Sequence, residues 1–398
     1  MHWFVPPKTH LAYAERIGIV IEQFSTGGSE RVAITFANRW ADRGREVTIY
    51  CAGADGPVRG LVDRAVGVVP VGGDGGRSRH AFARAIARTL PRQMPDVLVG
   101  PGNYHIPVLA SLAAALPARR PAIVAKLSNP IRRPGRSHLA QLLFEQGLRV
   151  RTARFDRVVA MSPVRAEEAG AVLRRRNVAC LAEPTLVGPA VKRRQQPSGL
   201  VLAIGRLAPQ KNISLALEAF ARTRCDSRLV ILGEGEEYGA LRDRADALAL
   251  GDRVRFLGFV DDVAPWLAAA DALLCSSRFE GYPAALVEAL AAGVPVVTTP
   301  CSAALSEFMI DASCGAVVPG DAKALAAALD DVLAEARTPS ADVRALLGQR
   351  HDADAAADAW LAMLDATVAA RRGYQPAPLR AAPPPPQPVE IATETVPA

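Results

Sequence analysis

The most constraining feature of the chain is a series of short, uninterrupted apolar runs, each followed by a polar loop and an amphipathic segment. Ile17–Ile21, Leu200–Gly205 and Leu229–Leu232 are such runs. Uninterrupted apolar runs are typical of strands that are buried on both faces, as in parallel sheets. Because the sequence has no sustained polar–apolar alternation, it favours an α/β fold with doubly wound parallel sheets over an all-β fold.

The length of the chain predicts two domains. At 398 residues it exceeds the size of about 250–300 residues at which a single core stops growing. A basic segment punctuated by proline and glycine, from Pro184 to Gly199, predicts the hinge. We therefore expect an N-terminal domain over 14–188, a second domain over 189–354 and, from the prolines of 373–398, a disordered tail.

Two carboxylates, Glu280 and Glu288, frame an apolar segment. A short strand over 271–278 precedes them, and a helix over 284–292 carries the second. If both were helical they would lie about 12 Å apart along the axis. That separation suits a nucleotide sugar, with one carboxylate on the sugar and the other on the ribose. The alternative is a capping glutamate followed by a solvated one.

Two cations follow the apolar run at Leu200. Arg206 and Lys211 stand between that strand and a helix over 214–221. Open α/β sheets bind phosphate-bearing ligands at the carboxyl ends of their strands and at helix amino termini. The pair is therefore placed to hold a diphosphate, although an arginine and a lysine in a loop are often simply solvated.

A second candidate phosphate loop lies near the amino terminus. Gly27 and Gly28 follow the first strand and open a helix. Adjacent glycines let a ligand approach the backbone closely, and a helix amino terminus favours negative charge. The alternative is an ordinary strand-to-helix turn.

Five motifs occur in order over residues 200 to 300: Gly205-Arg206 with Lys211-Asn212, Leu229–Gly235, Val254–Val260, Phe279–Pro283 and Glu288–Val297. This region resembles the donor-binding domain of the retaining glycosyltransferases of family 4. The resemblance extends over roughly 14–370 and is specific mainly in the second half. It implies the GT-B architecture, two Rossmann-like domains facing across a cleft, with 355–372 crossing back onto the first domain.

The resemblance also implies roles for individual residues. Arg206 and Lys211 would hold the donor diphosphate, Glu280 would bond the donor sugar and Glu288 the ribose. Backbone groups at Phe259 and Val260 would contact the base. The donor site would be completed by Gly281, Tyr282 and Pro283 and, across the cleft, by Gly27 and Gly28.

The implied activity is transfer of a hexose from a nucleotide diphosphate sugar to an acceptor hydroxyl with retention, in polysaccharide or glycolipid assembly. Arg206, Lys211 and Glu280 would be the catalytic residues. The leaving phosphate would itself take the acceptor proton, so that no separate nucleophile is needed. The nucleotide sugar is a co-substrate, and no cofactor is expected.

The sequence departs from the family at one place. Many members have a histidine near the donor sugar at the end of a first-domain strand, and the matching stretch, 122–130, has none. Ser128 and Asn129 are candidates for neutral hydrogen bonds there, and Lys126 for assisting the leaving phosphate. His105 is a candidate substitute, although a single loop histidine is more often structural.

No metal is expected at the site. Asp352-Ala353-Asp354 matches the DxD pattern of metal-dependent glycosyltransferases. However, these residues open an alanine-rich helix, where acids are favoured by the helix dipole. Arg206 and Lys211 would already neutralise the diphosphate.

Positive charge is concentrated between Arg119 and Arg194, which contain 17 Lys and Arg against 5 Asp and Glu. Such a segment suits an anionic membrane surface, although a solvated arginine-rich surface is the alternative. Nucleic acid is disfavoured because aromatic residues are not interleaved with the basic runs. With no signal sequence and no run of 18 apolar residues, we expect a cytoplasmic protein, peripheral on the inner face of the cell membrane if the basic segment docks there.

Two other functions remain open from the sequence. A nucleotide-sugar epimerase shares the two-domain fold and would need acid–base residues on either side of the sugar. A dinucleotide oxidoreductase is suggested by Gly233, Gly235 and Gly239 after a strand. In that pattern the third glycine falls one position late for the dinucleotide fingerprint.

Overall fold

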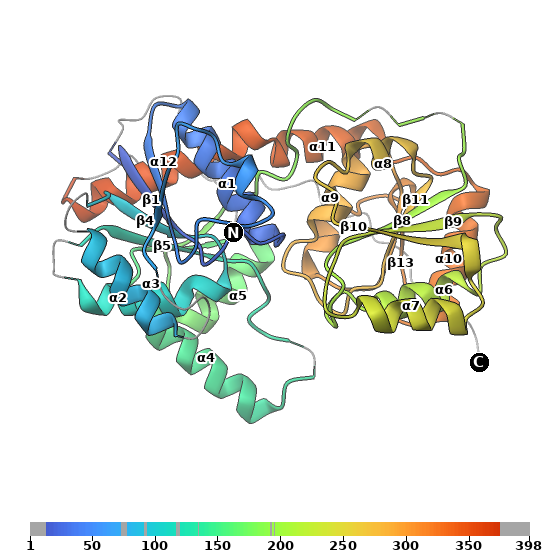
Figure 1. Cartoon of the computed structure of the whole chain (residues 1–398), viewed down its shortest axis with the longest axis horizontal. Helices are drawn as coiled ribbons and strands as arrows, with labels where there is room; N and C mark the ends of the chain where they lie inside the picture. Colours follow the sequence, from blue (N-terminus) through green and yellow to red (C-terminus); the bar gives the residue numbers. More distant parts are fainter. Residues whose placement is uncertain are drawn as a thin grey trace. The chain divides into compact units, whose positions relative to one another are not determined.

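The computed structural model describes residues 13–72, 78–90, 94–116, 120–133, 135–191, 193–194 and 196–374. They form two compact units (Figure 1). Unit 1 contains the described residues up to Gly188, Glu280–Tyr282 and those from Gln349 onward; unit 2 contains Pro189–Phe279 and Pro283–Gly348. Apart from residues 373 and 374, the predicted disordered tail lies outside the described residues.

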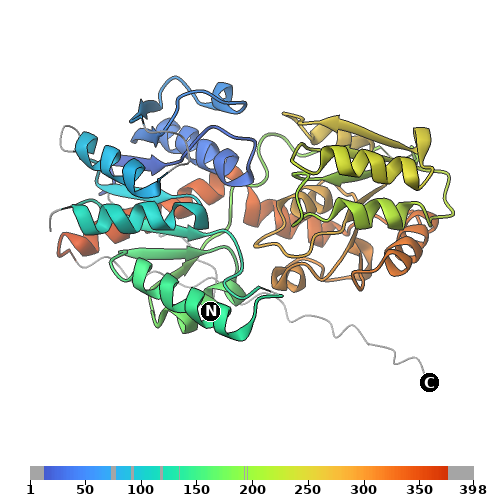
Figure 2. The ribbon, with the colours of Figure 1, turned by 60° about the horizontal axis from the view of Figure 1, so that its bottom comes forward.

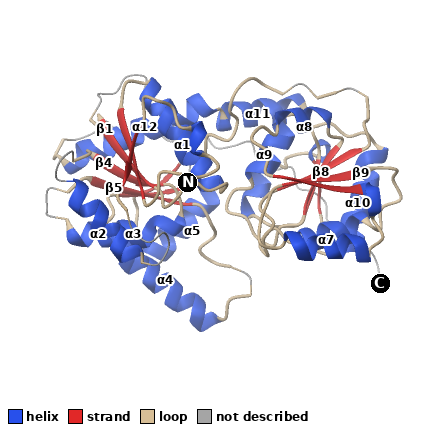
Figure 3. Ribbon diagram, in the orientation of Figure 1, coloured by secondary structure: helices blue, strands red, loops and turns tan. Residues whose placement is uncertain are grey.

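Unit 1 is built on a parallel sheet of seven strands in the order β3-β2-β1-β4-β5-β6-β7. The strands are β1 Arg16–Val20, β2 Glu46–Cys51, β3 Gly67–Pro70, β4 Val97–Gly100, β5 Ala122–Leu127, β6 Arg157–Ala160 and β7 Val178–Cys180. Every residue of β4 and β5 is buried. The apolar run Ile17–Ile21 supplies β1, which pairs with β4 in the middle of the sheet. Helices cover the sheet on both faces (Figure 3).

Helices cover both faces of this sheet (Figure 2). They are α1 Gly28–Asp42, α2 Arg79–Thr89, α3 Ile106–Ala115, α4 His138–Thr152, α5 Pro163–Leu173 and α12 Ala353–Arg371. One core joins α2, α3 and α5 to one face of the sheet, with Leu148 of α4 at its edge. Helices α1 and α12 pack against each other, and α12 also contacts β5.

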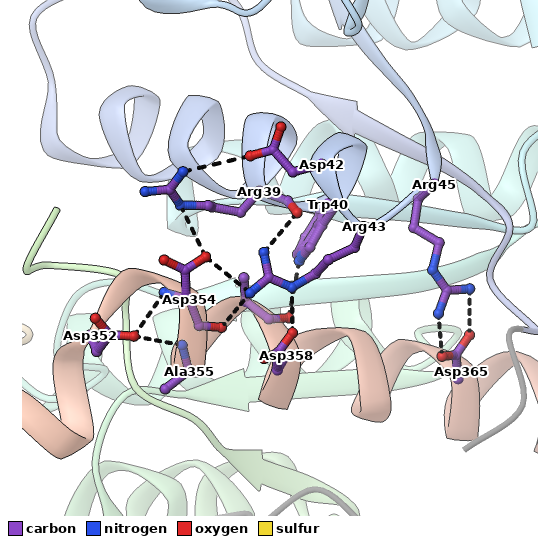
Figure 4. Close-up of polar contacts among 11 residues, drawn as sticks. Arg39, Trp40, Asp42, Arg43, Arg45, Asp352, Asp354, Ala355, Asp358 and Asp365 are labelled. Carbon is purple, nitrogen blue, oxygen red and sulfur yellow. Dashed lines mark hydrogen bonds and ion pairs between the residues drawn. The ribbon is translucent and has the colours of Figure 1, made fainter. Parts of the chain in front are cut away.

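Helix α12 is fixed to α1 by aromatic and polar contacts (Figure 4). The Trp40 indole donates to the Ala357 carbonyl oxygen at 3.2 Å. Asp365 is 2% exposed; its carboxylate accepts from the Tyr13 and Ala14 amides at 2.8 and 2.7 Å and pairs with Arg45 at 2.8 Å. These contacts make α12 part of unit 1.

Asp352 and Asp354 stabilise the first turn of α12. Asp352 caps the helix by accepting from the amides of Asp354 and Ala355, and Asp354 pairs with Arg39 and Arg43 at 3.4 and 3.1 Å. The prediction that this DxD sequence opens a helix is confirmed.

Unit 2 has a parallel sheet of six strands in the order β10-β9-β8-β11-β12-β13. The strands are β8 Leu200–Ile204, β9 Arg228–Leu232, β10 Val254–Gly258, β11 Ala272–Cys275, β12 Val296–Thr298 and β13 Gly315–Val317. Its helices are α6 Ile213–Phe220, α7 Tyr238–Ala247, α8 Ala264–Ala269, α9 Ala284–Ala291 and α10 Ala322–Ala334, followed by α11 Ala341–His351. Helices α6, α7 and α10 share one core with the sheet.

Both sheets are parallel and doubly wound, as the sequence predicted. Among the residues that the structure describes, no helix has the length and apolar character needed to cross a bilayer.

Candidate active site

The predicted phosphate-binding cations, Arg206 and Lys211, lie at the point in unit 2 where the strand order reverses. From β8 the chain moves outward to β9 and β10, then returns to β11 on the other side of β8. Because the strands are parallel, the loops that follow β8 and β11 leave the same edge of the sheet and diverge there. This is where open α/β sheets bind their ligands.

The loop after β8 carries the two cations. Arg206 is exposed and Lys211 is half-buried. Gly205 has φ +148°, and a Cβ at this position would lie 2.8 Å from Lys211 Cε. The glycine therefore allows both a backbone conformation that other residues rarely adopt and the close passage of the Lys211 side chain.

The loop after β11 is bonded to the loop after β8. The Ser276 hydroxyl donates to the carbonyl oxygens of Lys211 and Asn212 at 3.1 and 2.9 Å. Gln210 accepts from the Arg278 amide at 2.8 Å through its carbonyl oxygen, and its side-chain amide donates to the Phe279 carbonyl at 2.9 Å. These bonds hold the lysine-bearing loop beside the segment that leads to Glu280.

Glu280 and Glu288 differ in their surroundings. Helix α9 begins at Ala284, so Glu280 lies in the loop between strand and helix, as predicted. The separation of about 12 Å holds only for two helical residues and does not apply here. Glu280 is 7% exposed and Glu288 is half-buried. Glu280 is therefore a buried loop residue, whereas Glu288 is a half-buried residue of helix α9.

The segment Glu280–Tyr282 packs as part of unit 1. A Cβ on Gly281 would lie 2.0 Å from the Ser128 carbonyl oxygen, so only glycine fits without displacement of that backbone. The Tyr282 hydroxyl lies 2.9 Å from His351 Nε2. Gly281 and Tyr282 are thus supports for Glu280, and Pro283 precedes α9 directly.

The predicted base-contacting residues Phe259 and Val260 follow β10. Gly233, at the end of β9, donates to the Gly258 carbonyl at 2.7 Å, and its own Cβ would lie 2.0 Å from the Gly205 carbonyl oxygen. The Gly233 region therefore brings 258–260 next to the loop with Arg206. Close backbone packing accounts for Gly233 and Gly235 without a dinucleotide, since a Cβ on Gly235 would lie 2.2 Å from the Leu207 carbonyl oxygen.

In unit 1 the strand order reverses between β1 and β4. Gly27 precedes α1 and Gly28 opens it, and a Cβ at Gly28 would meet nothing within 4 Å. A Cβ at Gly27 would lie 2.2 Å from a Glu30 carboxylate oxygen, so this acid lies directly beside the first glycine of the loop.

Asn103 holds the stretch that lacks the family histidine. Its side-chain oxygen accepts from the backbone amides of Ser128 and Asn129 at 2.6 and 3.1 Å. Its own backbone amide donates to the Ser128 hydroxyl at 3.2 Å. Asn103 therefore fixes both candidate hydrogen-bonding residues. Sequence reasoning missed this role, because nothing local links positions 25 residues apart.

His105 is buried, with 1% of its surface exposed. Burial lowers its pKa to about 4, and the charges of Lys126 and Arg79 act in the same direction. The imidazole is therefore neutral at neutral pH, a state that disfavours proton donation by this residue.

Lys126 is directed away from solvent. It is 1% exposed and forms a buried ion pair with Glu183. The Glu183 carbonyl oxygen in turn lies 3.4 Å from His351 Nδ1. This placement speaks against the expected contact between Lys126 and a leaving phosphate. It connects Lys126, Glu183, His351 and Tyr282 in one buried polar chain that sequence reasoning missed.

The predicted donor-binding residues do not line either of two cavities found among the described residues. One, of about 610 Å³ in unit 2, lies between α6 and the loops after β11 and β12. The other, of about 780 Å³ in unit 1, lies along α3. Within the described ranges, no group of three or more His, Cys, Asp or Glu side chains is arranged to hold a metal ion.

Comparison with known proteins identifies both halves of the chain. The family model "Glycosyltransferase Family 4" matches residues 26–178, and "Glycosyl transferases group 1" matches residues 198–335. The second match contains Arg206, Lys211, Glu280 and Glu288.

Curated relatives match over part of their length. The lipopolysaccharide core biosynthesis glycosyltransferase LpsE of Rhizobium meliloti is 35% identical over 170 residues, 42% of this chain and 49% of the relative. A Campylobacter jejuni diphospho-undecaprenol N-acetylgalactosaminyltransferase is 35% identical over 121 residues, 30% of this chain and 33% of the relative. The chain thus spans half or less of the length of these relatives.

A solved structure shares the fold over nearly the whole chain. The Anabaena protein HepE, in complex with UDP-glucose, has a TM-score of 0.71 at 19% identity and covers 90% of this chain and 99% of its own. Together with the two parallel sheets, this similarity shows the GT-B architecture that the sequence predicted.

Proposed function

Because the chain belongs to the family 4 glycosyltransferases, we propose that it transfers a hexose from a nucleotide diphosphate sugar to an acceptor hydroxyl with retained anomeric configuration. The observation that carries the proposal is the joined pair of loops after β8 and β11. Hydrogen bonds from Ser276, Gln210 and Arg278 hold the Lys211 loop beside the segment that leads to Glu280.

The donor and acceptor are proposed from the relatives. HepE binds UDP-glucose, which supports a uridine diphosphate hexose as the first donor to test. LpsE acts in lipopolysaccharide core biosynthesis, and the Campylobacter enzyme acts on a diphospho-undecaprenol-linked sugar. We therefore expect a glycan acceptor on a lipid, in polysaccharide or glycolipid assembly at the inner face of the membrane.

In the proposed reaction the bond between the sugar and the diphosphate breaks while the acceptor oxygen attacks from the same face. Arg206 and Lys211 stabilise the charge that develops on the diphosphate. Glu280 holds sugar hydroxyls and Glu288 the ribose, and the leaving phosphate takes the acceptor proton. Ser128 and Asn129, held by Asn103, provide neutral hydrogen bonds near the sugar in place of the family histidine.

The test is thermal unfolding with a panel of nucleotide sugars, followed by transfer assays with excess chelator. A true donor at 100 times its Kd should add about 2.7 kcal/mol to the free energy of unfolding. Turnover should survive the chelator, because the proposal assigns neutralisation of the diphosphate charge to Arg206 and Lys211 and not to a metal ion. No stabilisation by any nucleotide sugar would contradict the donor site. Turnover restored only by magnesium or manganese would contradict the role of Arg206 and Lys211 in neutralising the diphosphate.

A further inference from the structure

Helix α4 carries an exposed apolar stripe. Leu139, Leu142 and Leu143 are 66%, 47% and 64% exposed, and Val150 is 74% exposed. At 100° per residue these positions fall within one third of the helix circumference. The four side chains therefore form one continuous face, which we call the α4 stripe.

The opposite face of α4 is what attaches the helix to unit 1. Among the residues of α4 only Leu148 and Thr152, in its last turns, are buried. Helix α4 contacts α3 and α5, and Figure 1 shows it at the lower border of unit 1. The α4 stripe thus points away from the core that the helix contacts.

The surroundings of the α4 stripe are basic. Residues 131–155 contain six arginines and one aspartate or glutamate, Glu145. Glu145 already pairs with Arg132 at 3.1 Å. Arg151 and Arg154 are exposed at the end of the helix, whereas Arg175 donates to the Thr152 carbonyl at 2.7 Å and is held by the protein.

A basic hollow adjoins the α4 stripe. The unit 1 cavity of about 780 Å³ shares Val150 and Arg151 with α4 and is also lined by Arg79, His80 and Arg154. Ser78, Ser111 and Tyr104 also line it. Cations and hydroxyls beside an apolar face match the phosphate and acyl layers of an anionic bilayer.

We infer that the α4 stripe is a membrane-docking surface whose partner is an anionic lipid bilayer. Its leucines enter the acyl boundary while Arg151, Arg154 and the basic hollow contact lipid phosphates. The charge favours lipid over a second copy of the chain, because two such arginine-rimmed faces would repel each other. The inference deepens the proposed function by assigning the surface that brings the enzyme to a lipid-linked acceptor.

The experiment measures flotation of the full chain with phosphatidylcholine vesicles, with and without phosphatidylglycerol. Wild type should bind only the anionic vesicles, and less as salt rises. Leu139→Gln with Leu143→Gln should lower the partition coefficient by about tenfold or more. The matched control, Leu61→Gln with Val317→Gln, removes exposed apolar side chains elsewhere and should bind as wild type does.

A second pair of variants tests the charge. Arg151→Gln with Arg154→Gln should weaken binding and flatten its dependence on salt. A Leu143→Trp variant should gain fluorescence quenching by brominated lipid beyond that of wild type. Circular dichroism and thermal unfolding should be unchanged in all of these exposed-site variants.

Three results would overturn the inference: no binding of wild type to anionic vesicles at low salt, undiminished binding by the Leu139 and Leu143 double variant, or a dimer in light scattering that this double variant dissolves. Nucleotide-sugar stabilisation of the same proteins reports separately on the proposed function. A variant that binds nucleotide sugar but not vesicles supports the docking surface alone. If wild type binds vesicles but no nucleotide sugar stabilises it, only the proposed function is contradicted.

Discussion

At the residue scale, Arg206 and Lys211 carry the most specific proposed role, which is to stabilise the diphosphate. Both lie in the loop after β8, and the Lys211 side chain passes directly over Gly205. Replacing either with Ala should lower kcat by about a hundredfold, because each would stabilise charge that develops on the diphosphate. Isothermal titration should also show weaker binding of the nucleoside diphosphate. Arg222→Ala, at an exposed arginine of unit 2, is the matched control; lost turnover with unchanged diphosphate affinity would contradict the role.

The two glutamates should separate in their effects. Glu280→Gln should lower transfer by about tenfold to a hundredfold with little change in nucleoside diphosphate affinity, because this carboxylate is assigned to the sugar. Glu288→Gln should weaken nucleoside diphosphate binding as well, through the ribose. Titration of free nucleoside diphosphate and steady-state kinetics measure the two effects. Equal losses of nucleotide affinity would reverse or remove the division.

The sequence predicted the positions of the site loops but not the long-range partners of individual side chains. The loops with Arg206 and Glu280 were placed correctly because each follows an apolar run that can only be a buried strand. Lys126 was placed at a ligand because its strand was recognised, but its partner Glu183 is 57 residues away and no local pattern indicates it. The same holds for Tyr282 and His351, 69 residues apart. Pairings of this kind depend on the folded chain.

At the element scale, α12 offers a comparison of two carboxylates on one helix. Asp365 is buried and accepts from two backbone amides and Arg45, whereas the side chain of Asp358 is 55% exposed in its pair with Arg43. Asp365→Ala should lower the free energy of unfolding by about 3–5 kcal/mol, since it leaves buried donors and a buried charge unpaired. Asp358→Ala should cost about 1 kcal/mol or less. Chemical denaturation measures both, and similar costs would contradict the assigned role of burial.

Elements were predicted from sequence to within a few residues. The run Leu200–Gly205 is β8, Leu200–Ile204, and the helix expected over 284–292 is α9, Ala284–Ala291. Apolar period and glycine or proline boundaries determine these limits locally. The assignment of Glu280–Tyr282 to unit 1 was not foreseen, because it depends on Gly281 meeting Ser128 and Tyr282 meeting His351.

At the scale of the whole molecule, two buried histidines make stability sensitive to acid. Burial lowers the pKa of His105 to about 4 and that of His351 to about 3. An unfolded histidine titrates near 6.5, so below that pH the unfolded state binds more protons and folding is disfavoured. The stabilisation is complete above pH 6.5 and is lost as pH falls towards 4 for His105 and 3 for His351. Each should contribute a loss of about 2 kcal/mol between pH 7 and pH 5.

Urea denaturation across this pH range measures the effect. His105→Gln and His351→Gln should each make the free energy of unfolding less dependent on pH, whatever their own cost at pH 7. His80→Gln, at an exposed position, should leave the dependence unchanged. An identical slope in wild type and both buried-site variants would show that other groups cause the acid sensitivity.

The packing of Glu280–Tyr282 on unit 1 has a consequence for building hybrid enzymes. A second half transplanted from a relative, cut at residues 188 and 349, would bring its own residues at positions 280–282. These three positions pack with unit 1, which the recipient supplies. Gly281 must clear the Ser128 backbone, and Tyr282 must find His351 or its equivalent. A hybrid built to exchange donor specificity should therefore keep the recipient's own residues at these three positions, within the incoming sequence.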